Sequence, residues 1–162
     1  WGLLVGHQWA KPFNLPDHLL TFEVVRLEPW VYSHRDSANI YEYYGKSIGY
    51  DLEPNSLAYK FNWLWFTTPA LRCELQADRI LHGVGDRNFG VADDTVKEFL
   101  AGDIETSTMI QLRLEYEFFQ NMWIKLELSH LYISNQKIDD TFDLFDSNHS
   151  LSGFRFGIDL NY

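Results

Sequence analysis

The chain has 162 residues, of which 46% are hydrophobic and 17% aromatic, and its formal net charge at pH 7 is -10. This length suits one domain, and the aromatic content argues against disorder and favours strands. The acidic excess argues against a nucleic-acid partner, because phosphate binding needs clustered Lys and Arg, and the single cysteine, Cys73, excludes a disulfide framework.

The sequence contains neither a membrane helix nor a secretory signal. No run approaches the ~18 apolar residues that a membrane helix needs, and no basic stretch precedes an apolar one near residue 1. We therefore expect a mature chain or a fragment, and either a soluble protein or a membrane barrel.

Seven segments alternate apolar and polar side chains with the period of two that is typical of strands. In chain order they cover 1–10, 19–34, 56–67, 70–83, 107–119, 121–134 and 150–162. The second segment is the least regular, because Pro29 near its middle predicts either a bulge or an early end. The last segment ends in "FRFGIDLNY" (154–162), which alternates up to its final aromatic residue.

The connections between these segments alternate in length. Short connections cover 11–18, 67–70 and the neighbourhood of 120–121, whereas long ones cover 35–55, 84–106 and 135–149. Short turns on one side and long loops on the other are typical of transmembrane β-barrels, in which the long side is extracellular.

The two faces of the predicted sheet differ in chemical character. One face carries apolar side chains, and the other carries charges of both signs: Arg72, Glu74, Asp78, Arg113, Glu115, Glu117, Lys125, Glu127, Arg155 and Asp159. A soluble sheet and a barrel both explain this alternation. The strand ends favour the barrel, because membrane barrels carry aromatic girdles at both interfaces. Candidate girdle residues are Trp9, Trp63, Trp65, Phe118, Phe119 and Tyr162 at the short turns, and Trp1, Tyr59 and Tyr132 at the long loops.

The sequence thus predicts an all-β fold, as a transmembrane antiparallel β-barrel in a bacterial outer membrane, with residues 1–162 as its C-terminal part. Bacterial barrels have an even number of strands, with both ends in the periplasm. Seven strands would instead begin on the extracellular side. We therefore expect an odd number of further strands before residue 1, or a partner chain that closes the sheet, and a barrel sealed by these residues alone would contradict this expectation.

The closing residues Arg155, Gly157, Leu160 and Tyr162 resemble the C-terminal signal of bacterial outer-membrane barrels. That signal combines a polar residue, a glycine and alternating apolar positions with a final aromatic residue. The resemblance implies recognition by the barrel-assembly machinery.

A second resemblance lies in "FEVVRLEPWVYSH" (22–34) and "NIYEYYGKSIGYDLEPNS" (39–56). These stretches resemble the outer-membrane capsule-assembly proteins of the Wzi type. The matching residues are Glu23, Pro29, Tyr32, His34, Tyr41, Gly45, Gly49, Leu52, Pro54 and Asn55. Ile48 and Glu53 depart from the usual Leu and Gly. The resemblance implies a large monomeric barrel, of about 18 strands within the bacterial range, that attaches or organises surface polysaccharide and is not an enzyme.

The loop 35–55 supplies the candidate polysaccharide contacts Arg35, Tyr41, Tyr43, Tyr44 and Lys46. Sugars present apolar ring faces beside hydroxyl groups, so aromatic planes combined with charged hydrogen-bonding groups suit them. The alternative is that these tyrosines, together with Tyr50, pack the loop onto the barrel rim.

The stretch 83–102 begins with a Gly-rich turn and predicts a short helix over about 91–100 that could cover the barrel mouth. Arg87 and Asn88 are candidates for contact with an acidic sugar. The alternative is a salt bridge within the loop, from Arg87 to Asp86 or Asp93.

The acidic stretch 137–150 suggests a Ca²⁺ hypothesis through Asp139, Asp140, Asp143, Asp146 and His149. Its spacing does not match the calcium-binding loop, so we expect a solvated acidic face and no bound metal. The sequence also lacks a Gly-x-Ser-x-Gly elbow and a zinc-binding His pair, so we expect no catalytic residue and no cofactor.

The leading interpretation is a non-catalytic outer-membrane barrel involved in the attachment or assembly of capsular polysaccharide. Its expected partners are outer-membrane lipid and lipopolysaccharide, surface polysaccharide, the barrel-assembly machinery and other outer-membrane proteins. The alternatives are a diffusion porin, which would prefer cations because acidic residues exceed basic ones on the polar face, and an outer-membrane lipid-modifying enzyme.

Overall fold

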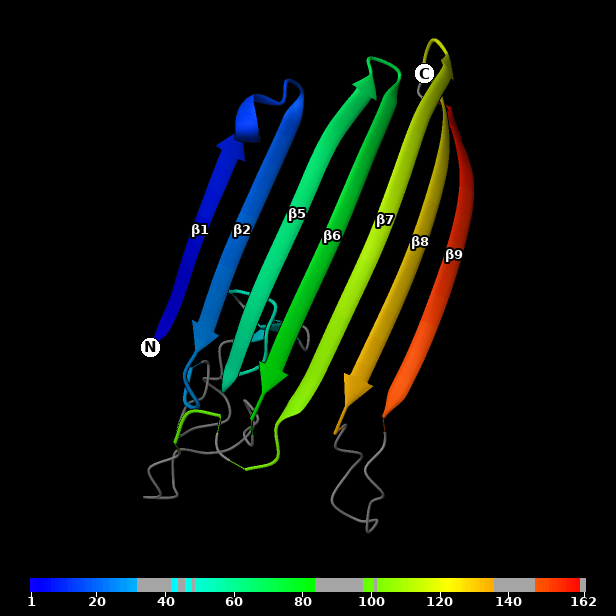
Figure 1. Ribbon diagram of the computed structural model, residues 1–162. Coiled ribbons are helices and arrows are strands. Elements are labelled where there is room, and N and C mark those ends of the chain that lie inside the picture. The colour runs from blue at the N-terminus through cyan, green and yellow to red at the C-terminus, as the bar shows by residue number, and fades with distance from the viewer. Residues whose placement is uncertain are drawn as a thin grey trace.

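The computed structural model describes residues 1–31, 42–43, 46–47, 49–83, 98–100, 102–135 and 148–160, with the backbone alone at 42–43, 46–47 and 160. Seven strands lie side by side in one sheet (Figure 1). They are β1 (Gly2–Ala10), β2 (His18–Leu27), β5 (Ser56–Thr68), β6 (Leu71–His82), β7 (Glu105–Phe119), β8 (Met122–Ser134) and β9 (His149–Leu160). The all-β prediction and its seven strands are therefore confirmed.

The second strand ends earlier than the predicted boundary at residue 34. β2 stops at Leu27, and Glu28 begins a turn in which the Val31 N–H donates to the Glu28 carbonyl at 3.1 Å. Pro29 has no N–H to offer a neighbouring strand, so of the two predicted outcomes the structure shows the early end.

Every neighbouring pair in the seven-stranded sheet is antiparallel, in the order β1-β2-β5-β6-β7-β8-β9. Because direction reverses at each step, β1 and β9 point the same way, and they lie at the two opposite edges (Figure 1). Within the described part of the chain the sheet is open.

The short connections lie at one end of the sheet (Figure 1). The β1–β2 connection contains the 3-10 helix η1 (Pro12–Asn14), and the Lys11 N–H closes it by donating to the His18 carbonyl at 2.9 Å. The β7–β8 turn depends on Asn121, whose φ of 64° is the left-handed conformation that Asn tolerates better than most residues. The segregation of short and long connections predicted from the sequence is confirmed by the strand bounds.

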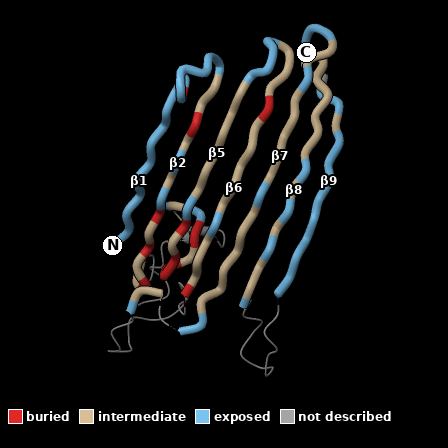
Figure 2. The backbone as a smooth tube through the Cα atoms, in the orientation of Figure 1, coloured by how far each residue is buried: buried red, intermediate tan, exposed pale blue. Residues whose placement is uncertain are grey.

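Most of the buried residues gather at the long-loop end (Figure 2). Val25, Leu27 and Ala58 line the sheet there, and Leu52 from the β2–β5 connection packs on them, with Val31, Tyr50 and Ile80 around the cluster. Two further short strands in that connection, β3 (Glu42–Tyr43) and β4 (Lys46–Ser47), pair with each other in a separate two-stranded sheet. The core is thus a loop folded onto one face of a sheet.

Of the helix predicted over 91–100, the structure describes only 98–100. These three residues are not helical, and Leu100 has a left-handed φ of 54°. Among the residues that the structure describes, no helix is long and apolar enough to cross a membrane.

Candidate functional site

The sheet has a polar face and an apolar face, because alternate residues of a strand point to opposite sides and directly opposed residues share a side. On the polar face, four residues of successive strands oppose one another with alternating charge: Glu74, Arg113, Glu127 and Arg155. We call this row the charge ladder. Arg113 lies 3.1 Å from Glu74 and 3.4 Å from Glu127, and Arg155 lies 3.6 Å from Glu127.

A second charged row flanks the charge ladder toward the short turns. Arg72 lies 3.4 Å from Glu115 and also 3.6 Å from Glu74, which joins the two rows, and Lys125 pairs with Asp159. Cross-strand pairs of opposite charge stabilise a sheet by about 0.2 to 1 kcal/mol each, and partial exposure keeps them near the low end. The charges of these rows pair with one another and favour this strand register over its neighbours.

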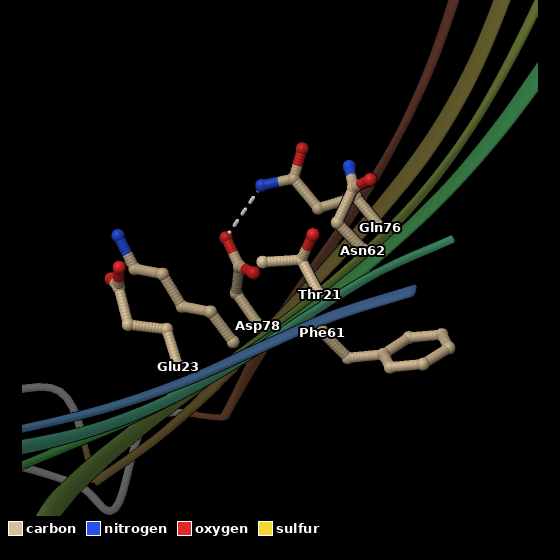
Figure 3. A pocket seen from close by; sticks show the side chains of 7 residues that line it. Thr21, Glu23, Phe61, Asn62, Gln76 and Asp78 are labelled. Carbon is tan, nitrogen blue, oxygen red and sulfur yellow. Dashed lines mark hydrogen bonds between the residues drawn. The ribbon is translucent and has the colours of Figure 1, made fainter. Parts of the chain in front are cut away.

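A shallow hollow of about 190 Å³ lies on the polar face between β2, β5 and β6. Thr21, Glu23, Lys60, Asn62, Gln76 and Asp78 line it with polar groups, whereas Phe61 points to the other side of the strands (Figure 3). Gln76 donates to one oxygen of Asp78 at 2.7 Å, and the other oxygen is buried without a hydrogen-bond partner among the described residues. The hollow therefore offers hydroxyl, amide and carboxylate groups to a polar ligand.

Tyr50 of the β2–β5 connection packs on the polar face beside this hollow. Its hydroxyl donates to Glu23, and the ammonium of Lys60 lies 4.7 Å from the centre of its ring. Burial, together with the hydrogen bond to Glu23, raises the pKa of the Tyr50 phenol. Tyr50 thus packs the β2–β5 connection onto the polar face of the sheet.

Asn55 holds together the segments that meet at the long-loop end. It is fully buried with a left-handed φ of 58°. Its side-chain oxygen accepts from the Leu100 N–H at 2.8 Å, its carbonyl accepts from Gly83 at 2.9 Å, and its own N–H donates to Glu28 at 3.3 Å. Four residues of the Wzi-type resemblance are buried in this region: Pro29, Leu52, Pro54 and Asn55.

Most of the predicted polysaccharide contacts lie outside the described residues: Arg35, Tyr41, Tyr44, Arg87 and Asn88. The backbones of Tyr43 and Lys46 oppose each other in the β3–β4 pair, so the fold brings these two positions together. In the acidic stretch, residues 137–147 also lie outside the described part, and His149 begins β9.

The polar hollow was not predicted as a site. The sequence signal for the hollow is the alternation of polar and apolar residues, which puts Glu23, Lys60 and Asp78 on the polar side of three strands. Their register, Glu23 opposite Lys60 and Lys60 opposite Asp78, needed the structure.

The predicted assembly signal falls in and after β9. Arg155 and Gly157 lie on the polar face, opposite Glu127 and Lys125, and the backbone of Leu160 ends the strand. Tyr162 lies outside the described residues.

The apolar face leaves large hydrophobic side chains exposed on six of the seven strands, and on β6 they are half-buried. Exposed members with more than 40% of their surface accessible include Leu3, Val5, Phe22, Tyr59, Ile110, Tyr116, Leu128, Phe154, Phe156 and Ile158. Aromatic residues gather at its short-turn end, where Trp63 donates to His18 at 3.0 Å and its ring centre lies 5.0 Å from that of Trp65. A continuous apolar surface of this extent marks an interaction with lipid or with another apolar layer.

Toward the long-loop end the apolar face becomes polar, along an oblique boundary. On five strands the first polar residues beyond the hydrophobic stretch are Arg26 on β2, Arg79 on β6, Thr108 on β7, His130 on β8 and Ser152 on β9, whereas the face stays apolar to Leu57 on β5 and is interrupted on β1 by His7, opposite Phe22. The cross-strand register places Ser152 of β9 level with Phe22 of β2. Phe22 lies four residues before Arg26, so the boundary shifts by four residues between β2 and β9. At about 3.4 Å per residue and about 4.8 Å per strand, the boundary crosses the sheet at roughly 30° to the hydrogen-bonding direction.

Among the described residues, no group of three or more His, Cys, Asp or Glu side chains is placed to hold a metal ion. No family model, curated protein or solved structure matches this chain.

Proposed function

We propose that this sheet is part of a bacterial outer-membrane β-barrel, with its apolar face in lipid and its polar face toward the lumen. The observation that carries the proposal is the exposed apolar face with its oblique polar boundary. In a barrel whose strands tilt by about 35–45°, a level membrane surface makes that angle with the hydrogen-bonding direction, which is close to the slope of the boundary found here. A soluble sheet packed on a second layer has no reason for such a slope.

Strand length and closure agree with this proposal. β5, β6, β7, β8 and β9 have 12 to 15 residues, and about 9–11 tilted residues suffice to cross a bilayer. β1 and β9 run in the same direction, so antiparallel closure needs an odd number of additional strands. We propose that the same polypeptide or a partner chain supplies them.

Spin labels test the placement of the two faces. The complete protein is reconstituted in vesicles, with Cys73→Ala as the background. The variant Phe156→Cys carries the label on the apolar face, and the variant Ser129→Cys carries it on the polar face. We expect the label at 156 to collide with lipid-dissolved oxygen and not with a water-soluble nickel complex, and the label at 129 to show the reverse. A label at 156 shielded from both reagents would indicate a covering protein layer and overturn the membrane proposal.

For the activity, we propose that the barrel helps attach or organise capsular polysaccharide at the cell surface without catalysis. Support comes from the Wzi-type resemblance and from the burial of its matching residues. Pro29, Leu52, Pro54 and Asn55 anchor the connection that carries Tyr41, Tyr43 and Tyr44. The residues that match that family would then position the loop, and the tyrosines would contact the sugar.

The test is the amount of polysaccharide retained on cells. Replacing Tyr41, Tyr43 and Tyr44 together by Ala should release polysaccharide into the medium, while the barrel is still present in the outer membrane. Replacing Tyr116 and Tyr132 by Phe on the apolar face is the control and should retain it. Unchanged retention in the first variant would exclude these tyrosines as the site.

A diffusion channel is the second candidate, and the acidic excess on the polar face favours it. Steady, sizeable conductance of the complete protein in planar bilayers, with a preference for cations, would replace the capsule proposal by this one.

A further inference from the structure

Two charged side chains stand on the otherwise uncharged apolar face. Counting Asp, Glu, Lys and Arg over the described strands, only Arg26 and Arg79 fall on that side, and both lie at its polar boundary near the long loops. β5 separates their strands. Arg79 opposes Tyr59, which in turn opposes Val24, two residues from Arg26.

Arg79 is exposed and forms no ion pair or side-chain hydrogen bond with the described residues. Its neighbours across the strands are Tyr59 and Thr108, both on the same face, and residue Tyr59 is 47% exposed. A guanidinium flanked by hydroxyl groups offers several donors in a fixed fork, which suits a phosphate better than a single ammonium would.

Arg26 is held in place by its surroundings. Its guanidinium lies 2.8 Å from the Glu28 carboxylate, 3.8 Å from the ring centre of Phe99 and 5.2 Å from that of Trp1. Glu28 neutralises part of its charge, so Arg79 is the principal anion-binding group and Arg26 a rigid neighbour.

We propose that Arg79, with Tyr59 and Thr108, binds a phosphate group of the phosphorylated glycolipid in the outer leaflet, on the outside of the barrel. This inference rests on the proposed membrane placement. An unpaired Arg on a lipid-facing strand strongly destabilises a barrel when it lies at the bilayer centre, and destabilises it much less when it lies at the interface. Arg79 lies at the polar boundary of this face, which in the proposed placement is the depth of the lipid phosphates. At that depth its guanidinium forms charge-assisted bidentate hydrogen bonds with a phosphate.

The binding of lipid A to the complete protein in phosphatidylethanolamine nanodiscs tests the site. We expect Arg79→Gln to weaken binding of diphosphorylated lipid A roughly tenfold, as loss of one charge-assisted contact predicts. Arg79→Lys should fall between this variant and the wild type, because it keeps the charge and loses the fork. The matched control is Arg155→Gln, which removes the same charge from the polar face, where the side chain is 79% exposed.

Equal weakening by Arg79→Gln and Arg155→Gln would overturn the site, since it would show a net-charge effect alone. Unchanged binding in Arg79→Gln would overturn it as well. The spin label at 156, measured in the same nanodiscs, separates the two proposals. A lipid-exposed label with unchanged lipid A binding contradicts only the phosphate site, whereas a label shielded from oxygen contradicts the membrane placement itself.

Discussion

The backbone N–H of Gly83 donates to the carbonyl oxygen of Asn55 at 2.9 Å, and this contact joins the end of β6 to the start of β5. The two residues approach so closely that a Cβ at position 83 would lie 2.5 Å from the Asn55 side-chain nitrogen and 2.9 Å from the Leu100 Cα. The long-loop end is therefore packed around a position where only glycine fits.

Gly83→Ala should destabilise the protein by about 1–3 kcal/mol, because the added methyl group forces the backbone of Leu100 away. The free energy of unfolding in urea, followed by tryptophan fluorescence, measures this loss. Gly6→Ala is the control, since its Cβ would make only an ordinary contact of 3.6 Å with Phe22. Equal stabilities of the two variants would contradict the packing described here.

Asn55→Ala should cost about 2–4 kcal/mol, because it leaves the partly buried Leu100 N–H without its acceptor and forces Ala into a left-handed conformation. Asn121→Ala separates the two causes. Asn121 has a similar φ of 64° but lies in an exposed turn, so its replacement should cost only about 1 kcal/mol. A similar loss in both variants would show that backbone strain alone matters.

The Tyr50 contact should depend on pH. Burial and the Glu23 hydrogen bond raise the pKa of the phenol, so the neutral form is favoured in the folded protein. Its contribution is complete below the ordinary tyrosine pKa of about 10 and is lost as the pH rises through the higher folded value. Relative to Tyr50→Phe, the wild type should be about 1 kcal/mol more stable at neutral pH.

Difference absorbance of tyrosinate between the wild type and Tyr50→Phe gives the titration of this one side chain. A Tyr50 that ionises below the ordinary value would contradict the burial and the hydrogen bond. A stability difference that grows with pH in the alkaline range would do the same.

The charge ladder should show coupling between directly opposed residues. In a double-mutant cycle with Arg113→Gln and Glu127→Gln, we expect a coupling of about 0.2–1 kcal/mol, which high salt should reduce. The cycle of Arg113→Gln with Asp159→Asn serves as reference, because Asp159 pairs with Lys125 instead. Zero coupling between Arg113 and Glu127 would mean that the ladder contributes nothing to stability.

The proposed membrane placement predicts a depth-dependent cost of charge along β7. Leu112 and Thr108 share the apolar face, and Thr108 lies at the polar boundary. Leu112→Lys should cost about 2–4 kcal/mol and Thr108→Lys about 0–1 kcal/mol, measured by unfolding from lipid vesicles. Equal costs at the two positions would contradict a lipid-facing band.

Local chemistry, read from the sequence, predicted the seven strands, their two faces and the segregation of short and long connections. This succeeded because alternation within one strand needs no knowledge of its neighbours. Pro29 predicted that the second strand has either a bulge or an early end. The choice between these two outcomes depended on the turn that begins at Glu28.

Only the tertiary structure decided which residues meet. Alternation assigns Arg113 to a face, yet a register shifted by two residues would keep that face and change each of its partners. The fold also chose the role of the β2–β5 connection, because Tyr50 and Asn55 reach partners on β2, on β5, after β6 and before β7. Such contacts join segments far apart in the chain, so their energy is set by three-dimensional packing, which local sequence patterns do not encode.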